Sequence, residues 1–184
     1  MRLESDRRVA NGVAVYACGG NAATMVHELT QAAFAGYEAL DPPSGASRET
    51  AESVRRDLEA AGGALAWLDS RPVGCLRFVI EADHLHVRRV AVTPELQGLG
   101  IGRALMAWAE AQAIDRRLSR VTVGVRLSLP GNLGFYRRLG YEVIAEHAHP
   151  GYDRPTWVLM QKTFQARAAE QCCRACPPSG GWTR

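Results

Sequence analysis

Three glycines separated by single residues could hold a phosphate group. Gly98, Gly100 and Gly102 follow the apolar run 90–92 and precede a segment with helical periodicity. The first amides of a helix lack intrahelical acceptors, and the helix dipole adds partial positive charge at the same end. Glycines also let a ligand approach the backbone closely. A strand, a glycine-rich turn and a helix in this order therefore predict a phosphate or pyrophosphate site.

Two common nucleotide-binding motifs do not fit this segment. A dinucleotide-binding turn needs a third small residue three positions after its second glycine. That position holds Arg103 if the motif begins at Gly98, and Leu105 if it begins at Gly100. The sequence also lacks the Gly-Lys-Ser/Thr of a P-loop. A turn without a ligand is the other interpretation, although three glycines at a helix start are unfavourable without a purpose.

A second motif supports a resemblance to a known family. The pattern Gln97-x-x-Gly100-x-Gly102 resembles the acetyl-coenzyme A motif of the GNAT N-acetyltransferase superfamily. Residues 132–141, Asn-Leu-Gly-Phe-Tyr-Arg-Arg-Leu-Gly-Tyr, resemble the later Asn and Tyr motif of the same superfamily, with a glycine where the family often has alanine. The two motifs occur in the family's order with a strand between them. The resemblance covers roughly residues 7–164.

The resemblance implies acetyl-CoA as the acyl-donor substrate. Amides of the segment 98–103 would hold its pyrophosphate, and the backbone of Val90 and Val92 would pair with the pantetheine arm. Asn132 would bond the cofactor near the thioester. The predicted cofactor-binding residues are Val90, Ala91, Val92, Gln97, Gly98, Leu99, Gly100, Ile101, Gly102, Arg103, Asn132 and Tyr136.

The resemblance also implies that Tyr136 is the general acid that protonates the departing thiolate of coenzyme A. Acyl transfer to an amine needs a neutral nucleophile, a place for the oxyanion and a proton for the sulfur. A tyrosine on a helix facing the thioester can supply that proton. Packing in the core beside Phe135 and Tyr141 is the alternative role.

His86 is the predicted general base. His84, His86, Arg88, Val90 and Val92 have the same parity, so a regular strand places them on one face. Histidine titrates near neutral pH, which suits a base. A partly exposed histidine without a role is the alternative interpretation, and His84 is a second candidate. Glu81 and Asp83 have the opposite parity, which a bulge would reverse.

Several residues are candidates for the acceptor side of the site. Arg88 or Arg89 could attract an acidic group of the substrate, or lie solvated on the sheet. Arg103 is either a phosphate contact or a surface residue. The segments 147–154, which includes Tyr152, and 34–37 are expected to border the acceptor pocket. They are not strongly acidic, which gives little support to a polycationic acceptor.

The order of elements predicts one mixed α/β (α+β) domain. Expected strands cover 8–17, 64–69, 73–81, 84–92, 121–125, 141–148 and 155–163. Expected helices run from Asn21, as the cap, to 36, from 47 or 48 to 61, from the glycine turn to about 114, and from 131 or 132 to 139. The sheet should be mostly antiparallel, with 84–92 and 121–125 as its parallel pair. The resemblance implies that this pair splays apart at the cofactor cleft.

Composition narrows the classes of protein. The 184 residues are 47% hydrophobic and 22% charged, which is typical of a globular domain of this length. The net charge of +3 comes mostly from the last twenty residues, so no basic nucleic-acid face is expected. No apolar run is long enough for a membrane span, and no secretory segment opens the chain. We therefore expect a cytoplasmic protein without nucleic-acid or membrane partners.

The five cysteines and the histidines do not suggest a metal site. Cys172, Cys173 and Cys176 lie in a segment rich in Pro, Gly and Ser, without a fourth ligand. Residues 1–164 are therefore expected to form the domain, and 165–184 a disordered tail. His147 and His149 have the spacing of a metal pair, but no third ligand is evident.

The sequence as a whole predicts an N-acetyltransferase. We expect direct transfer of an acetyl group from acetyl-CoA to a primary amine of a small molecule, amino acid or peptide, in a ternary complex. A non-catalytic acyl-CoA-binding domain of the same fold is the alternative. The resemblance is also compatible with a homodimer.

Overall fold

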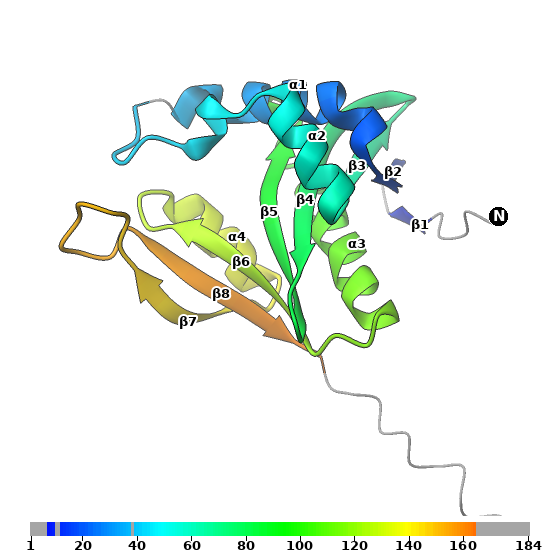
Figure 1. Ribbon diagram of the computed structural model, residues 1–184. Helices are drawn as coiled ribbons and strands as arrows, with labels where there is room; N and C mark the ends of the chain where they lie inside the picture. Colours follow the sequence, from blue (N-terminus) through cyan, green and yellow to red (C-terminus); the bar gives the residue numbers. More distant parts are fainter. Residues whose placement is uncertain (1–6, 10–11, 38, 165–184) are drawn as a thin grey trace, which may run out of the picture.

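A single central sheet organises the chain. The computed structural model describes residues 7–9, 12–37 and 39–164 (Figure 1). Its eight-stranded sheet has the order β1-β2-β3-β4-β5-β6-β8-β7. The strands are β1 (Arg7–Val9), β2 (Val13–Cys18), β3 (Gly63–Leu68), β4 (Arg71–Ile80), β5 (His84–Val92), β6 (Arg120–Arg126), β7 (Glu142–His147) and β8 (Trp157–Thr163).

The sheet is antiparallel except between β5 and β6, which confirms the predicted fold class. Parallel pairing runs from His84 with Arg120 to Val87 with Val123 and then stops. Both strands continue beyond this point, β5 to Val92 and β6 to Arg126. Figure 1 shows the two strands diverging from their paired ends. The sheet therefore opens at the carboxyl ends of its parallel pair.

Helices cover both faces of the sheet and enclose two cores. On one face, α1 (Ala23–Phe34) and α2 (Ala51–Ala60) bury Val26, Val54 and Leu58 against the sheet. On the other face, α3 (Ile101–Asp115) and α4 (Pro130–Arg138) belong to the larger core. Short 3-10 turns at Gly20–Ala22, Ala35–Tyr37, Gly45–Arg48 and Pro94–Leu96 complete the helical structure of the described residues.

Two predictions near the N-terminus are wrong in detail. The expected strand over 8–17 is two strands, β1 and β2, which form a hairpin with Val9 opposite Val13. Gly12, with φ of 76°, belongs to the reversal between them. Asn21 does not cap α1, because Gly20–Ala22 form a 3-10 turn and Ala22 precedes the helix without a side-chain cap. The cap of α2 is Thr50, which shares a reciprocal capping box with Ser53.

A bulge in β5 changes which side chains share a face. The register of β4 and β5 shifts between Cys75 opposite Ala91 and Arg77 opposite Arg88. Arg89 lies at this shift with φ of 52°, the left-handed conformation that few L-residues adopt. The expectation that His84, His86 and Arg88 face the same side as Val90 and Val92 is therefore wrong. Leu85 and Val87 belong to the α3 core before the bulge, whereas Val90 and Val92 pack against that core after it.

The proposed tail over 165–184, with its three cysteines, lies outside the described residues. In the part of the chain that the structure describes, no helix is long and apolar enough to cross a membrane. The same residues contain no group of three or more His, Cys, Asp or Glu side chains that could hold a metal ion.

Candidate active site

The glycine-rich turn has a backbone that requires glycine at two positions. Gly98 and Gly100 have φ of 82° and 88°. A Cβ at either position would meet nothing within 4 Å, so the requirement comes from backbone conformation and not from packing. Gly102 differs, because a Cβ there would lie 3.3 Å from the ring of Phe135. The third glycine therefore leaves room for the ring of Phe135 against the start of α3.

The turn leaves a row of amides without acceptors. Ala104 donates to the carbonyl of Gly100 at 3.0 Å, which closes the first turn of α3. Within the described residues, the amides of the segment 98–103 have no hydrogen bond. Unpartnered amides at the N-terminus of a fifteen-residue helix form an anion site, because the helix dipole adds positive charge there.

These amides border a groove of about 530 Å³. Its lining includes all of the predicted cofactor-binding residues except Ala91 and Leu99. Ala91 is buried in the core below α1, and Leu99 is 53% exposed. The other lining residues are Ala33, Phe34, Tyr37, Leu96, Gly131, Phe135 and Arg138. Arg103 and Arg138 are the charged residues of this lining, so the groove is positively charged.

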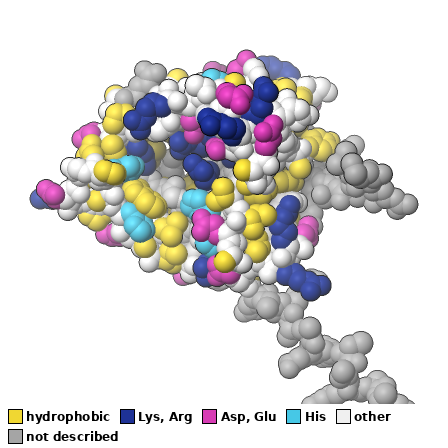
Figure 2. All heavy atoms as spheres, in the orientation of Figure 1, with side chains coloured by type: hydrophobic (Ala, Val, Ile, Leu, Met, Phe, Trp, Pro, Cys, Tyr) yellow, Lys and Arg dark blue, Asp and Glu magenta, His cyan; other side chains and the backbone are white. Residues whose placement is uncertain are grey.

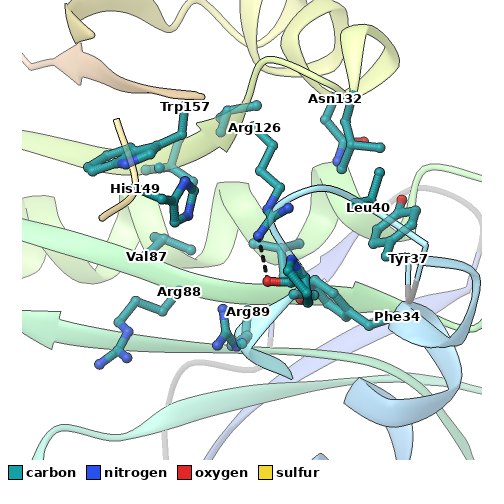
Figure 3. Close-up of a pocket in the computed structure, with 18 of the residues that line it drawn as sticks. Phe34, Tyr37, Leu40, Val87, Arg88, Arg89, Arg126, Asn132, His149 and Trp157 are labelled. Atoms are coloured by element: carbon teal, nitrogen blue, oxygen red, sulfur yellow. Dashed lines mark hydrogen bonds between the residues drawn. The ribbon is translucent and has the colours of Figure 1, made fainter. Parts of the chain in front are cut away.

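A second cavity of about 390 Å³ lies where β5 and β6 diverge (Figure 3). Residues from β5, β6, β8 and the segment 34–48 line it. The two cavities share five residues, Phe34, Tyr37, Val90, Asn132 and Tyr136. The rings of Phe34 and Tyr37 meet edge to face, with centroids 5.5 Å apart. The last turn of α1 and the 3-10 turn after it therefore form a wall of both cavities.

Helix α4 brings Asn132 and Tyr136 to the junction of the cavities. Pro130 begins this helix, where its missing N–H costs no hydrogen bond. Asn132 and Tyr136 are four residues apart, so they lie on the same side of the helix. Tyr136 is 7% exposed, and its ring packs against Phe135 and Tyr141. Tyr136 thus lines both cavities and also belongs to the core, the role weighed as its alternative.

Burial sets the protonation of the two proposed catalytic groups. It raises the pKa of Tyr136 far above its ordinary value, and the neighbouring Tyr37 adds to the rise. Burial lowers the pKa of His86, while Glu81 opposes the shift and Arg88 and His84 add to it. Near neutral pH, the phenol of Tyr136 is therefore protonated and the imidazole of His86 is neutral.

His86 lies in the second cavity in spite of the bulge. Its Nδ1 is 2.8 Å from Oγ1 of Thr122, the residue that pairs with His86 on strand β6. Within the described residues, Nε2 has no hydrogen-bond partner. His84 does not line either cavity, and its Nδ1 lies 3.0 Å from Oδ1 of Asp83. Glu81 and Asp83 are likewise absent from both linings.

Both arginines after His86 line the second cavity, but in different settings. Arg88 is exposed. Arg89 is 25% exposed, and its Nε donates to a carboxylate oxygen of Glu49 at 2.8 Å. Glu49 also accepts from the buried Arg77 at 2.5 Å. The bulge at Arg89 thus directs its guanidinium toward Glu49 beside the cavity.

The β7–β8 end of the molecule contributes His149 and Trp157. Both line the second cavity, and Nδ1 of His149 lies 2.5 Å from Oγ1 of Thr156. His147 stacks on the ring of Trp157, with centroids 4.3 Å apart, so the two histidines have different partners. Tyr152 does not line the cavity; its hydroxyl donates to Asp41 in the opposite loop.

Sequence reasoning missed Arg126 and the loop it binds. Arg126 ends β6, lines the second cavity and donates to the carbonyls of Pro42 and Pro43, the latter at 2.9 Å. Leu40 and Ser44 of the same loop also line the cavity, as do Gly45 and Arg48 of the 3-10 turn that follows it. Side chains alternate along a strand, so the even numbers of Arg126 and Thr122 could have predicted that they lie on the same face of β6. No local signal could have placed the loop.

The chain matches the model of the "Acetyltransferase (GNAT) family" over residues 24–141. This match covers more than half of the chain and includes both motifs of the site. The chain therefore belongs to the GNAT acetyltransferase family.

Solved structures of other acetyltransferases have a similar fold. The ribosomal-protein-S18-alanine N-acetyltransferase of Escherichia coli has a TM-score of 0.68 at 15% identity, with 87% of this chain and 99% of that chain covered. PaiA N-acetyltransferase of Thermoplasma acidophilum, in complex with coenzyme A, has a TM-score of 0.69 at 16% identity, covering 83% and 99%. A GNAT family acetyltransferase of Elizabethkingia anophelis with acetyl-CoA bound has a TM-score of 0.63 at 16% identity, covering 84% and 99%.

Proposed function

We propose that this protein transfers an acetyl group from acetyl-CoA to the primary amine of a small molecule, amino acid or peptide. The observation that carries the proposal is the junction of the two cavities at Asn132 and Tyr136. One cavity borders a row of unpartnered amides suited to a pyrophosphate. The other has the size of a small-molecule site. A donor in the first and an acceptor in the second would meet beside Tyr136.

The amides of the segment 98–103, with Arg103 and Arg138, would hold the phosphates of the donor. The free edge of β5 at Val90 and Val92 would pair with its amide-containing arm, because parallel pairing with β6 has already ended there. Asn132 would orient the thioester end. Coenzyme A or acetyl-CoA in the solved structures of similar fold supports this assignment.

The proposed chemistry is direct transfer in a ternary complex. His86, neutral because of burial, would take a proton from the incoming amine through its free Nε2, directly or through water. The amine nitrogen would attack the carbonyl carbon, and the bond from that carbon to sulfur would break. Tyr136 would then give its proton to the leaving thiolate. The order of events needs no covalent enzyme intermediate.

The first test is thermal unfolding with saturating acetyl-CoA. Binding at one hundred times the dissociation constant adds about 2.7 kcal/mol of stability, a rise of roughly 5–11 °C for a domain of this size. We expect the same rise with free coenzyme A and none with NAD or ATP. No rise at millimolar acetyl-CoA would contradict the proposal.

The second test separates an enzyme from a binding domain. Amines are supplied with acetyl-CoA, and the acetylated product and free thiol are both measured. Product and thiol in equal amounts would support transfer. Binding of acetyl-CoA without product from any amine would instead favour a non-catalytic acyl-CoA-binding domain.

A further inference from the structure

The second cavity is lined by cations and by no acids. Four arginines, Arg48, Arg88, Arg89 and Arg126, line it together with His86 and His149. None of its described lining residues is Asp or Glu. In Figure 2, basic side chains and histidines border the hollow on this face of the molecule. Such a cavity attracts anions and repels cations.

Arg126 is the most distinctive of these cations. Its side chain is partly buried, and its hydrogen bonds go to two backbone carbonyls. It forms no ion pair with any residue that the structure describes. Burial lowers its pKa, and the positive charge of Arg89 adds to that effect. A guanidinium has five N–H donors, so at least two remain for a ligand that supplies the missing negative charge.

No nearby carboxylate balances the positive charge of Arg126 within the described residues. Glu49 is bound to Arg89 and to the buried Arg77, and therefore offers no partner to Arg126. Arg88 and Arg48 are exposed, and neither forms an ion pair within the described residues. Figure 3 shows the guanidinium of Arg126 reaching toward the loop, with His149 and Trp157 to the left of it in this view.

An anion bound by Arg126 would belong to the acceptor and not to the phosphates of the donor. The phosphate-binding amides, Arg103 and Arg138 line the other groove, and Arg126 is absent from that lining. The cavity of Arg126 is also small, at about 390 Å³, and has apolar walls at Phe34, Leu40 and Trp157. This combination fits a molecule that joins an anionic group to a compact, partly apolar body.

We propose that the acceptor is a small amine that carries a carboxylate, an amino acid in the broad sense, and that Arg126 binds this carboxylate. The inference rests on the proposed function for the role of the amine. Arg88 contributes charge at the rim, and Arg89 remains paired with Glu49.

The test compares each amino acid with its own amide. An α-, β- or ω-amino acid and the matching carboxamide share their size and amine, but only the acid carries the negative charge. Binding is measured by calorimetry on the full chain saturated with coenzyme A, which cannot transfer acetyl. We expect the best acid to bind about 10- to 100-fold more tightly than its amide, because hydrogen bonds between charged partners are strong.

Three variants assign the preference. Arg126→Gln should reduce the ratio of acid to amide affinity to about threefold or less, the share that Arg88 contributes, and Arg126→Lys should restore part of it. Arg56→Gln, on the exposed surface of α2, is the matched control and should keep the full ratio. Arg88→Gln should lower the ratio about threefold without disturbing any contact to the loop.

The outcomes distinguish this inference from the proposed function. Wild-type protein that binds amides as tightly as acids would overturn the inference, as would failure of every amino acid to bind. A full ratio in Arg126→Gln would overturn the role of Arg126. A tenfold preference in binding, without acetyl transfer to any amine, would support the carboxylate site and count against the transferase.

Discussion

Nδ1 of His86 lies 2.8 Å from the hydroxyl of Thr122, the residue directly opposite on the parallel strand β6. This pair stands one position before β5 and β6 separate. The bond fixes the imidazole at the entrance to the gap between the strands. If Nδ1 donates its proton to Thr122, the lone pair of Nε2 is available to a substrate.

The pH dependence of turnover tests His86 as the base. Burial lowers the pKa of His86 from its ordinary value near 6.5. The charge of Glu81 opposes this shift, and the charges of Arg88 and His84 add to it. A base must be neutral, so kcat at saturating substrates should hold through neutral pH and fall only on the acidic side of that ordinary value. His86→Gln should lower kcat by about two to three orders of magnitude and remove this acidic limb. An unchanged limb in the variant would exclude His86 as the base.

Thr122→Val tests the orientation separately from the proton transfer. Valine has nearly the shape of threonine, and Thr122 is only 2% exposed, so the strand should keep its packing. The imidazole remains but loses its partner. We expect kcat to fall by about tenfold, with an acidic limb still present in the pH profile. Loss of the limb together with activity would mean that the two residues act as one unit.

Tyr136→Phe should lower kcat by about one to three orders of magnitude, with little change in the affinity for acetyl-CoA. The phenol carries the proton, because burial raises its pKa and keeps it protonated. Tyr141→Phe is a suitable control: its ring lies 5.8 Å from that of Tyr136 but lines neither cavity. Steady-state kinetics of both variants decide the role, and equal rates would reduce Tyr136 to a packing residue.

Gly100→Ala should weaken acetyl-CoA binding by about tenfold or more. Its φ of 88° costs an alanine about 1–2 kcal/mol, and relief of this strain would redirect the amides that follow. Gly151→Ala is the matched control, since Gly151 also has a positive φ, of 86°, and open space around it but lines neither cavity. Calorimetry with acetyl-CoA measures both. Equal affinity in the two variants would show that the left-handed turn is not needed.

Glu49→Gln should lower the free energy of unfolding by about 2–4 kcal/mol. Arg77 is 3% exposed and would keep only Asp57, at 2.6 Å, as its charged partner. The control is Glu52→Gln, which removes an exposed pair with Arg55 and should cost less than about 0.5 kcal/mol. Urea unfolding of both variants provides the comparison. A loss below 1 kcal/mol for Glu49→Gln would show that the buried network contributes little.

Local patterns predicted the part of the site that is local in the chain. The helix after the glycine turn, the strand over 84–92 and the helix that carries Asn132 and Tyr136 agree with the structure to within a few residues. Each has a strong period or a clear stop such as Gly140, with φ of 86°. The groove is made from these elements, so most of its residues could be named in advance.

The second cavity depends on contacts that no local pattern encodes. A positive φ at an arginine is rare, so the bulge at Arg89 could not be placed, and the shared face of β5 was predicted wrongly. Arg126 and the loop at Pro42 and Pro43 are more than eighty residues apart. Their meeting follows from the packing of the whole domain.

The wall that Phe34 and Tyr37 form between the two cavities has a thermodynamic consequence. Any ligand that shifts this wall when it fills one cavity must change the affinity of the other by some factor. Linkage requires the second ligand to change the affinity of the first by that same factor. If the two cavities hold donor and acceptor as proposed, the last turn of α1 is the element through which binding of one would change the affinity for the other.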